Sequence, residues 1–406
     1  MSERFIYFDN FNTTFPDPAV IALICNLMKS RLGNPSSHIH SAGIAAGQTL
    51  DEARQKVASF IGATPENIIF TSGATEANNL AIAGFLKANS KYGLAISEIE
   101  HFSIINQARK FRSEGKHVSF IDVDNTGLID MGQLEKIVQS GPILVSIAPA
   151  NPEIGTIQDI KLIGDICKKY HAILHCDATT SATFLEINVE KFGIGLLTLS
   201  GHNMYGPTGI GALYVAPKIN IAPLFEGGNQ ENGRRPGTEN FIGAAAMGEA
   251  GAIVKNNRNI WNANLEILGK ALWQGLADNV PFMHFTGHPE RRLPGHVSFW
   301  VEHIEGESLL LFLNMNGVMA ASGSACSSNL KGKDEEDLVA SHVLTAVGVP
   351  SDVCAGSITF SLAQYNTQDE VDYVISIMPG IVEKLLAMSP SYSDYKSKIE
   401  DPHGRR

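Results

Sequence analysis

The stretch Phe70-Thr71-Ser72-Gly73-Ala74-Thr75-Glu76-Ala77-Asn78-Asn79 runs from an apolar segment, through one glycine, into an amphipathic segment. The apolar part predicts a strand and the amphipathic part predicts a helix. Gly73 permits the tight turn between them, and the free backbone N–H groups of the first helical turn, near Ala74 and Thr75, could hold a phosphate. A plain helix start capped by Ser72 or Thr75 is the alternative interpretation.

The same change from short apolar runs to longer amphipathic runs repeats between about residues 34 and 217. It indicates a mostly parallel sheet with helices on its faces. We expect strands at 67–70, 94–97, 118–123, 143–148, 172–177, 196–200 and 211–215, and helices at 45–61, 76–88, 104–113, 131–138 and 160–170.

A second group of elements follows a long helical stretch at 241–276. It comprises strands at 296–301 and 357–362 and helices at 308–316, 340–347 and 368–388. We therefore expect a large parallel-sheet α/β domain over 15–260 and a smaller α+β domain built from 1–14 plus 261–388. Residues 389–406 are polar and are expected to form a flexible tail.

Composition and charge argue against some classes of binding partner. The chain has 406 residues, 44% of them hydrophobic, and a formal net charge of −11. A negative net charge argues against nucleic acid or an anionic membrane surface as a partner, since both select clustered cations. Neither a signal segment nor an apolar run long enough to span a bilayer is evident, so we expect a cytoplasmic protein.

Short motifs along the chain occur in the order and spacing of the cysteine desulfurases. They are Asn-Pro-Ser-Ser-His at 34–38, Ser-Gly-Ala-Thr-Glu at 72–76, Glu-His at 100–101, His-Cys-Asp-Ala-Thr at 175–179, Ser-Gly-His at 200–202, Arg-Pro-Gly-Thr at 235–238 and Ser-Gly-Ser-Ala-Cys-Ser at 322–327. From Tyr7 to about Met388 the chain therefore resembles this NifS/IscS-like family. The resemblance implies a homodimeric, fold-type I transferase of the aspartate aminotransferase-like fold, dependent on pyridoxal 5'-phosphate (PLP).

The family's cofactor-binding residues can be carried over where the motifs match. Asp177, at a strand end, would contact the pyridine nitrogen, and His101 would stack on the ring. The phosphate and its surroundings would be held by Ala74, Thr75, Ser200, His202 and Asn203, with Thr238 reaching in from the other subunit. A strand-end aspartate that caps a turn and a histidine that is a satisfied core residue are the alternatives.

The decisive departure from the family is at Asn203, in Leu196-Leu197-Thr198-Leu199-Ser200-Gly201-His202-Asn203-Met204-Tyr205-Gly206-Pro207. Family members carry the Schiff-base lysine there, and this chain has no lysine between Lys191 and Lys218. A carboxamide is not nucleophilic, so PLP, if bound, would be held noncovalently. In this respect the chain resembles archaeal members of the family that also lack the lysine.

Other departures fall at reacting positions. Pro152 stands where the family has an asparagine that donates to the ring hydroxyl, Thr359 where it usually has the arginine that grips the substrate carboxylate, and Thr180 where it has a glutamine. We expect classical desulfurase activity to be weak or lost, with His101 as a base for any residual activity. Whether the chain is an enzyme therefore stays open.

Cys326 lies in a polar, glycine-bearing stretch that predicts an accessible thiol. In the family this cysteine carries sulfur as a persulfide, taken from L-cysteine, to an iron–sulfur scaffold protein. Sulfide, which is already at the oxidation level of cluster sulfur, is the alternative small-molecule source of sulfur and would not pass through a persulfide. The alternative is an inactive, scaffold-docking partner in which Cys326 ligates or donates to a nascent cluster, such as [2Fe-2S]. A third alternative, another lyase or transaminase of this fold, meets the same obstacle at Asn203.

The five cysteines are odd in number and scattered, without CxxC spacing, which argues against disulfides and zinc. Cys25, Cys167 and Cys354 fit the pattern of small buried hydrophobes, and Cys176 is expected to face the sheet interior.

Overall fold

A computed structural model of the chain describes residues 4–322, 341–350 and 357–400. Within these ranges the largest sheet has seven strands in the order β2-β8-β7-β6-β5-β3-β4. The strands are β2 Ile68–Thr71, β3 Gly93–Ser97, β4 Val118–Ile121, β5 Ile143–Ser146, β6 Ile173–Asp177, β7 Leu196–Ser200 and β8 Gly211–Val215. Each predicted strand of this region is confirmed, with ends shifted by at most two residues.

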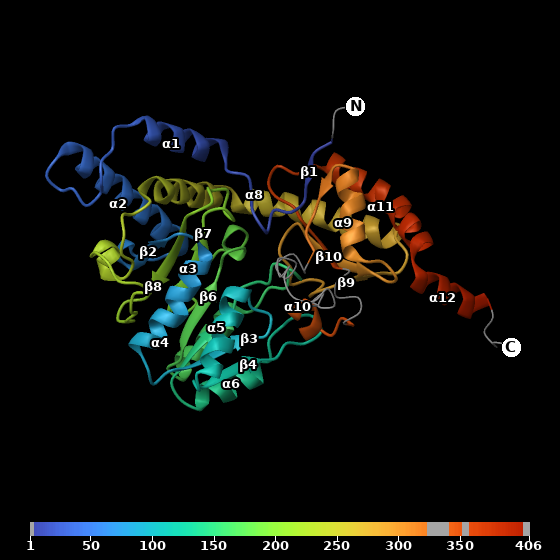
Figure 1. Cartoon of the computed structure of the whole chain (residues 1–406), viewed down its shortest axis with the longest axis horizontal. Coiled ribbons are helices and arrows are strands. Elements are labelled where there is room, and N and C mark those ends of the chain that lie inside the picture. The colour runs from blue at the N-terminus through green and yellow to red at the C-terminus, as the bar shows by residue number, and fades with distance from the viewer. Residues whose placement is uncertain (1–3, 323–340, 351–356, 401–406) are drawn as a thin grey trace.

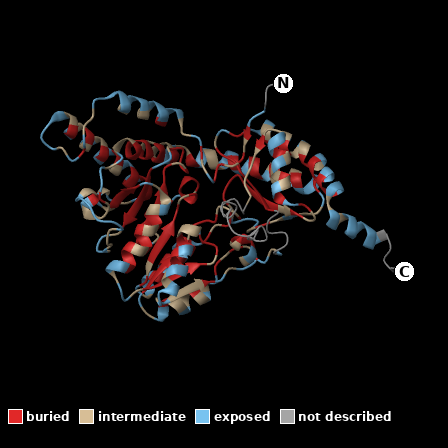
Figure 2. Cartoon of the chain, in the orientation of Figure 1, coloured by how far each residue is buried: buried red, intermediate tan, exposed pale blue. Residues whose placement is uncertain are grey.

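The sheet is mostly parallel, as the sequence predicts. Strands β4, β3, β5, β6 and β7 run parallel, and β8 is antiparallel to both of its neighbours, β7 and β2. Strands covered on both faces carry near-continuous apolar runs, and Figure 2 shows the central strands as buried. Because parallel strands end at one edge of a sheet, β6 and β7 bring Asp177 and Ser200 to the same edge.

Helices cover both faces of this sheet (Figure 1). They include α2 Ser41–Ile61, α3 Ala74–Asn79, α4 Phe85–Ala88, α5 Phe102–Ser113, α6 Met131–Gln139 and α7 Ile160–Lys169. The predicted helix at 76–88 is one helical segment in which a π-helical turn, Leu80–Gly84, joins α3 to α4. Short 3-10 turns lie at Pro65–Asn67, Ser181–Thr183 and Gln230–Gly233.

The long helix α8, Phe241–Asn279, runs from the large sheet to the second group of elements (Figure 1). That group contains a three-stranded sheet in the order β12-β10-β9, with β10 antiparallel to both neighbours. Its elements are β9 Met283–Phe285, β10 His296–Val301, α9 Gly306–Met315, α10 His342–Ala346, β12 Ser357–Ser361 and α11 Gln368–Met388.

Several elements were not expected from the sequence. They are β1 Ile6–Tyr7, α1 Pro18–Lys29, β9, β11 Val318–Met319 and α12 Pro390–Glu400. Strands β1 and β11 pair with each other, far apart in the chain. Helix α12 replaces part of the expected flexible tail, because the rings of Tyr392 and Tyr395 pack against Phe282 and His303.

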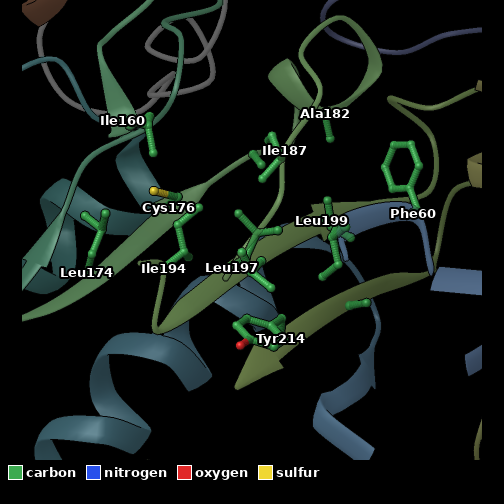
Figure 3. Close-up of a cluster of buried hydrophobic side chains, with 14 of the residues drawn as sticks. Phe60, Ile160, Leu174, Cys176, Ala182, Ile187, Ile194, Leu197, Leu199 and Tyr214 are labelled. Atoms are coloured by element: carbon green, nitrogen blue, oxygen red, sulfur yellow. The ribbon is translucent and has the colours of Figure 1, made fainter. Parts of the chain in front are cut away.

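The buried side chains gather into separate clusters on the two groups of elements. One cluster, which includes Cys176, Leu197 and Tyr214, packs on the large sheet (Figure 3). Another joins the N-terminal segment, the second half of α8 and the small sheet. We call the elements around these two sheets the large domain and the small domain; the division of the chain at 15–260 and 1–14 plus 261–388 stays a prediction. In the described ranges no helix is long and apolar enough to cross a membrane.

Candidate active site

A cavity of about 470 Å³ opens at the edge of the large sheet where the parallel strands end. The large domain contributes the start of α3, the end of β6 and the loop after β7 to its lining, and the small sheet contributes β12. Crevices at this edge are the usual ligand sites of open α/β sheets. Of the residues carried over from the family, it is lined by Ala74, Thr75, His101, Asp177, His202 and Asn203.

The start of α3 offers backbone donors to the cavity. Its N-cap is Gly73, with no side-chain capping bond, so the alternative of a cap by Ser72 or Thr75 is wrong. The Ser72 N–H donates instead to Glu76 Oε2 at 2.6 Å. The N–H groups of Ala74 and Thr75 make no hydrogen bond within the described ranges, which leaves them available to an anion.

Asp177 is held rigidly at the end of β6. Its Oδ2 accepts from Asn78 Nδ2 at 2.7 Å, and its Oδ1 accepts from the Thr179 N–H at 3.0 Å. Next to it, burial lowers the pKa of His175 to about 4, so that ring is neutral and hydrogen-bonds Ser146. A fixed, hydrogen-bonded carboxylate beside a neutral histidine is suited to binding a protonated ring nitrogen.

His101 lines the cavity from the N-terminus of α5. Its Nδ1 accepts from the Ser103 N–H at 3.1 Å, which makes His101 the N-cap of that helix. Since Nδ1 is an acceptor, the proton of the neutral ring is on Nε2. The side chain is exposed, so the alternative of a satisfied core histidine does not apply.

Asn203 lines the cavity but is only 5% exposed. Its Nδ2 donates to the Phe11 carbonyl at 2.7 Å, while Oδ1 has no hydrogen-bond partner among the described residues. The described residues that line the cavity include neither lysine nor arginine. Within the described residues, therefore, no amine faces the cavity that could bond covalently to an aldehyde.

The remaining carried-over residues are placed differently. His202 lies at the cavity, where its Nδ1 is 3.2 Å from Thr13 Oγ1 and burial lowers its pKa. Ser200 is fully buried, is outside the lining, and its hydroxyl has no hydrogen-bond partner in the described part of the chain. Thr238 is exposed and also outside the lining; its expected role was in a second subunit.

The other departures from the family also lie at the cavity. Pro152, Thr180 and Thr359 all line it. The Thr359 hydroxyl donates to the Glu153 carbonyl at 3.1 Å, and the Pro152 carbonyl accepts from His296 Nε2 at 3.1 Å. These residues therefore present neutral groups at the position where the family resemblance implies an arginine that binds the substrate carboxylate.

Three carboxyl groups that line the cavity have raised pKa values, which the sequence did not predict. Burial raises the pKa of Glu100 to about 8, although its Oε1 accepts from the Ala148 N–H at 2.8 Å. Burial likewise raises the pKa of Glu153 to about 8 and that of Asp9 to about 6. These shifts depend on burial by residues distant in the chain, which no local motif announces. Asn78 had a local signal, because it lies four residues beyond Ala74 on the same face of α3.

The cysteine predictions have mixed outcomes. Cys167 and Cys176 are buried, as expected, and burial raises both thiol pKa values. Cys25 is exposed, so its expected burial is wrong: α1 lies on the outside of the large domain and buries only Val20. Cys326 and Cys354 lie outside the described residues. Within those residues no group of three or more histidine, cysteine, aspartate or glutamate side chains could hold a metal ion.

Comparison with known proteins identifies the family. Residues 6–374 match the family model of class-V aminotransferases. The chain is 40% identical to a cysteine desulfurase IscS of Archaeoglobus fulgidus over 95% of this chain and 99% of the relative, and 41% identical to that of Methanosarcina thermophila over 95% and 94%. A solved NifS-like protein superimposes with a TM-score of 0.86, at 31% identity over 94% of this chain and 100% of that one.

The chain therefore belongs to the class-V aminotransferases, with the fold-type I architecture that their PLP enzymes share. Within that class it is a member of the cysteine desulfurase family.

The family implies PLP, and most of the site fits it. The available N–H groups at the start of α3 suit a phosphate, and Asp177 suits a pyridinium nitrogen. The unpartnered Asn203 Oδ1 also leaves a buried acceptor for a ligand. Covalent attachment does not fit, since Asn203 offers only an amide.

Proposed function

We propose that this chain is a cysteine desulfurase-like protein of iron–sulfur cluster assembly that holds PLP noncovalently. Bound PLP would supply an electron sink for chemistry at an amino-acid carbon. The residues that would hold it are Ala74 and Thr75 at the phosphate, Asp177 at the ring nitrogen and His101 over the ring.

One observation carries the proposal: a cavity equipped for PLP has Asn203 at the position of the family's lysine and no other amine in its described lining. Losing a positioned acid–base group typically costs about a hundred- to ten-thousand-fold in rate. We therefore propose that release of sulfur from L-cysteine is slow or lost. His101 is the group best placed for residual proton transfer, since its side chain faces the cavity and is not buried.

In this proposal Cys326 is the sulfur carrier. When cysteine loses its sulfur and becomes alanine, the Cys326 thiol gains that sulfur as a persulfide and later passes it to a scaffold protein. A cytoplasmic homodimer is part of the proposal. The dimer is supported by the exposed apolar side chains of Ile21 and Met28 on α1 and of Ile39 just before α2, which a second subunit would cover.

The test combines a spectrum with mass spectrometry. The protein is titrated with PLP, treated with borohydride, and separately exposed to L-cysteine with and without PLP. We expect absorption of a bound free aldehyde, no borohydride-trapped adduct, and a PLP-dependent persulfide on Cys326 that forms slowly. Rapid, steady alanine release would contradict the proposal.

The second candidate is a non-enzymatic partner in which Cys326 ligates or donates to a nascent [2Fe-2S] cluster. The absence of lysine and arginine from the described cavity lining also favours this role. Failure to bind PLP, together with a Cys326-dependent cluster spectrum in the presence of a scaffold, iron and sulfide, would establish it over the first candidate.

A further inference from the structure

The small domain contains a buried cation close to the cavity that has no role in the proposed site. Arg292 precedes β10, and its guanidinium stacks on Trp273, with Cζ 4.8 Å from the ring centroid. Its Nη1 donates to His296 Nδ1 at 2.9 Å and to Ser298 Oγ at 3.3 Å, and its Nη2 donates to the Thr286 carbonyl.

The charge of Arg292 is not neutralised by any carboxylate of the described chain. All of the partners just named are neutral, no salt bridge of this residue is present in the described ranges, and its buried Nε has no partner there. Burial lowers its pKa to about 10, which still leaves it charged at neutral pH. A buried, unpaired cation is costly to maintain unless it serves a ligand or stabilises a neighbouring negative charge.

The sheet register brings this cation next to Thr359. Ser298 on β10 is the cross-strand partner of Thr359 on β12, so their side chains lie on the same face. The backbone N–H and C=O of Thr359 both bond Ala321 on the other side of β12. Ser298 and Thr359 therefore form a non-hydrogen-bonded pair, the kind in which side chains approach most closely.

Thr359 lines the cavity, whereas Arg292 lies one side chain behind it. We propose that Arg292 is a specificity-determining residue that attracts the carboxylate of an amino-acid ligand from behind Thr359. It would partly replace the direct grip that a threonine cannot make. Over roughly 12 Å with an effective dielectric of about 20, such an attraction corresponds to about a tenfold gain in affinity.

This inference rests on the proposed function, because it assumes that the cavity binds a small sulfur-bearing amino acid. Among the other titratable groups, Glu153 and Glu100 also line the cavity, and ionisation of either would oppose a bound carboxylate. Binding is therefore best measured near pH 6.5, where burial keeps both protonated, since it raises their pKa values to about 8.

The experiment compares two ligands that differ by the carboxylate, L-cysteine and cysteamine, by calorimetric titration of the purified full-length protein. Wild type, Arg292→Gln and Arg292→Lys are measured, after circular dichroism establishes that each is folded. We expect wild type to bind L-cysteine about tenfold more tightly than cysteamine. Arg292→Gln should abolish that preference, and Arg292→Lys should keep most of it.

Cysteamine affinity should be the same in all three proteins, which a merely structural role of Arg292 would not produce. Equal losses of L-cysteine affinity in both variants, or no preference in wild type, would overturn the inference and leave the proposed function intact. Wild type that binds neither ligand would overturn both.

Discussion

The cavity has two walls that differ in what supplies their polar groups. The wall from the large domain uses the start of α3 and the end of β6, where backbone N–H groups and Asp177 point at the ligand space. The other wall, made by the loop after β7, the loop at 150–155 and β12 of the small sheet, presents Asn203, Pro152 and Thr359, all neutral. Backbone donors come with the fold, whereas a reactive amine or a guanidinium is lost by a single substitution. A scaffold can therefore keep the equipment for binding a cofactor while it loses the groups that react.

The largest effect should come from restoring the amine. Asn203→Lys places a primary amine at the cavity, and we expect L-cysteine desulfuration to rise by about a hundred- to ten-thousand-fold. The buried amide already faces a cavity of about 470 Å³, which has room for the longer side chain. Alanine release and a borohydride-trapped PLP adduct are the measurements.

Thr208→Lys, at an exposed position of the same lining, is the control and should not gain activity. If both variants gained equally, the position of Asn203 would have no special meaning and the contrast between the walls would fail.

A substitution on the wall that binds PLP should strongly lower the affinity for PLP. Asp177→Asn keeps the shape but removes the carboxylate that Asn78 and Thr179 hold in place. Loss of a charge-assisted hydrogen bond in a water-poor site is worth roughly 1.5–3 kcal/mol, so PLP affinity should fall by about ten- to a hundredfold. Fluorescence titration with PLP measures it.

Asp165→Asn, at an exposed carboxylate paired with Lys161 on α7, provides the comparison and should leave PLP affinity unchanged. An unaltered affinity in Asp177→Asn would show that this wall does not bind the pyridine ring.

The sequence predicted the wall built from α3 and β6 better than the other wall, because local sequence patterns encode the first wall and contacts between distant segments form the second. The strands and the turn at Gly73 are encoded by apolar runs and a glycine that are contiguous in the chain, so their positions were confirmed. On the other wall, the position of Thr359 depends on its cross-strand register with Ser298. The raised pKa values of Glu100 and Glu153 depend on burial by distant segments. Neither can be seen in a local pattern.

Helix α12 illustrates the same limit outside the site. Its residues are polar and suggested a tail, but two tyrosines find ring partners at Phe282 and His303, which lie about a hundred residues earlier in the chain. Tertiary contacts of this kind override local composition.

The next prediction concerns how the free energy of unfolding depends on pH. Burial raises the pKa of Glu100 from 4.5 to about 8, so the folded protein holds this proton more tightly than the unfolded chain does. The stability that this group contributes is complete below pH 4.5 and is lost as the pH rises toward about 8. Since each pKa unit corresponds to about 1.4 kcal/mol, the shift corresponds to a loss of up to about 5 kcal/mol from this group.

Glu100→Gln should remove that component, because the amide keeps an acceptor for the Ala148 N–H and cannot ionise. Urea unfolding at pH 5 and pH 8.5 measures the difference, with the exposed Glu383→Gln as the control. Identical pH slopes for wild type and Glu100→Gln would mean that this carboxyl is not buried as described.

The smallest effect concerns Ser200, which is buried at the end of β7. Its buried hydroxyl has no hydrogen-bond partner in the described part of the chain, so Ser200→Ala should change the free energy of unfolding by less than about 0.5 kcal/mol without PLP. Thr183→Val is the contrasting variant, since the Thr183 hydroxyl donates to the Asn203 carbonyl at 2.7 Å and its loss should cost about 1 kcal/mol.

With PLP present the expectation for Ser200→Ala changes. A neutral hydrogen bond to phosphate is worth about 0.5–1.5 kcal/mol, so PLP affinity should fall by about two- to tenfold if the hydroxyl serves the cofactor. Ser200 lies outside the cavity lining and its hydroxyl has no hydrogen-bond partner in the described chain, so this variant tests whether a bound phosphate completes that hydrogen bond. If Ser200→Ala binds PLP as tightly as wild type does, the hydroxyl does not contact the cofactor. The binding wall then comprises only α3 and β6.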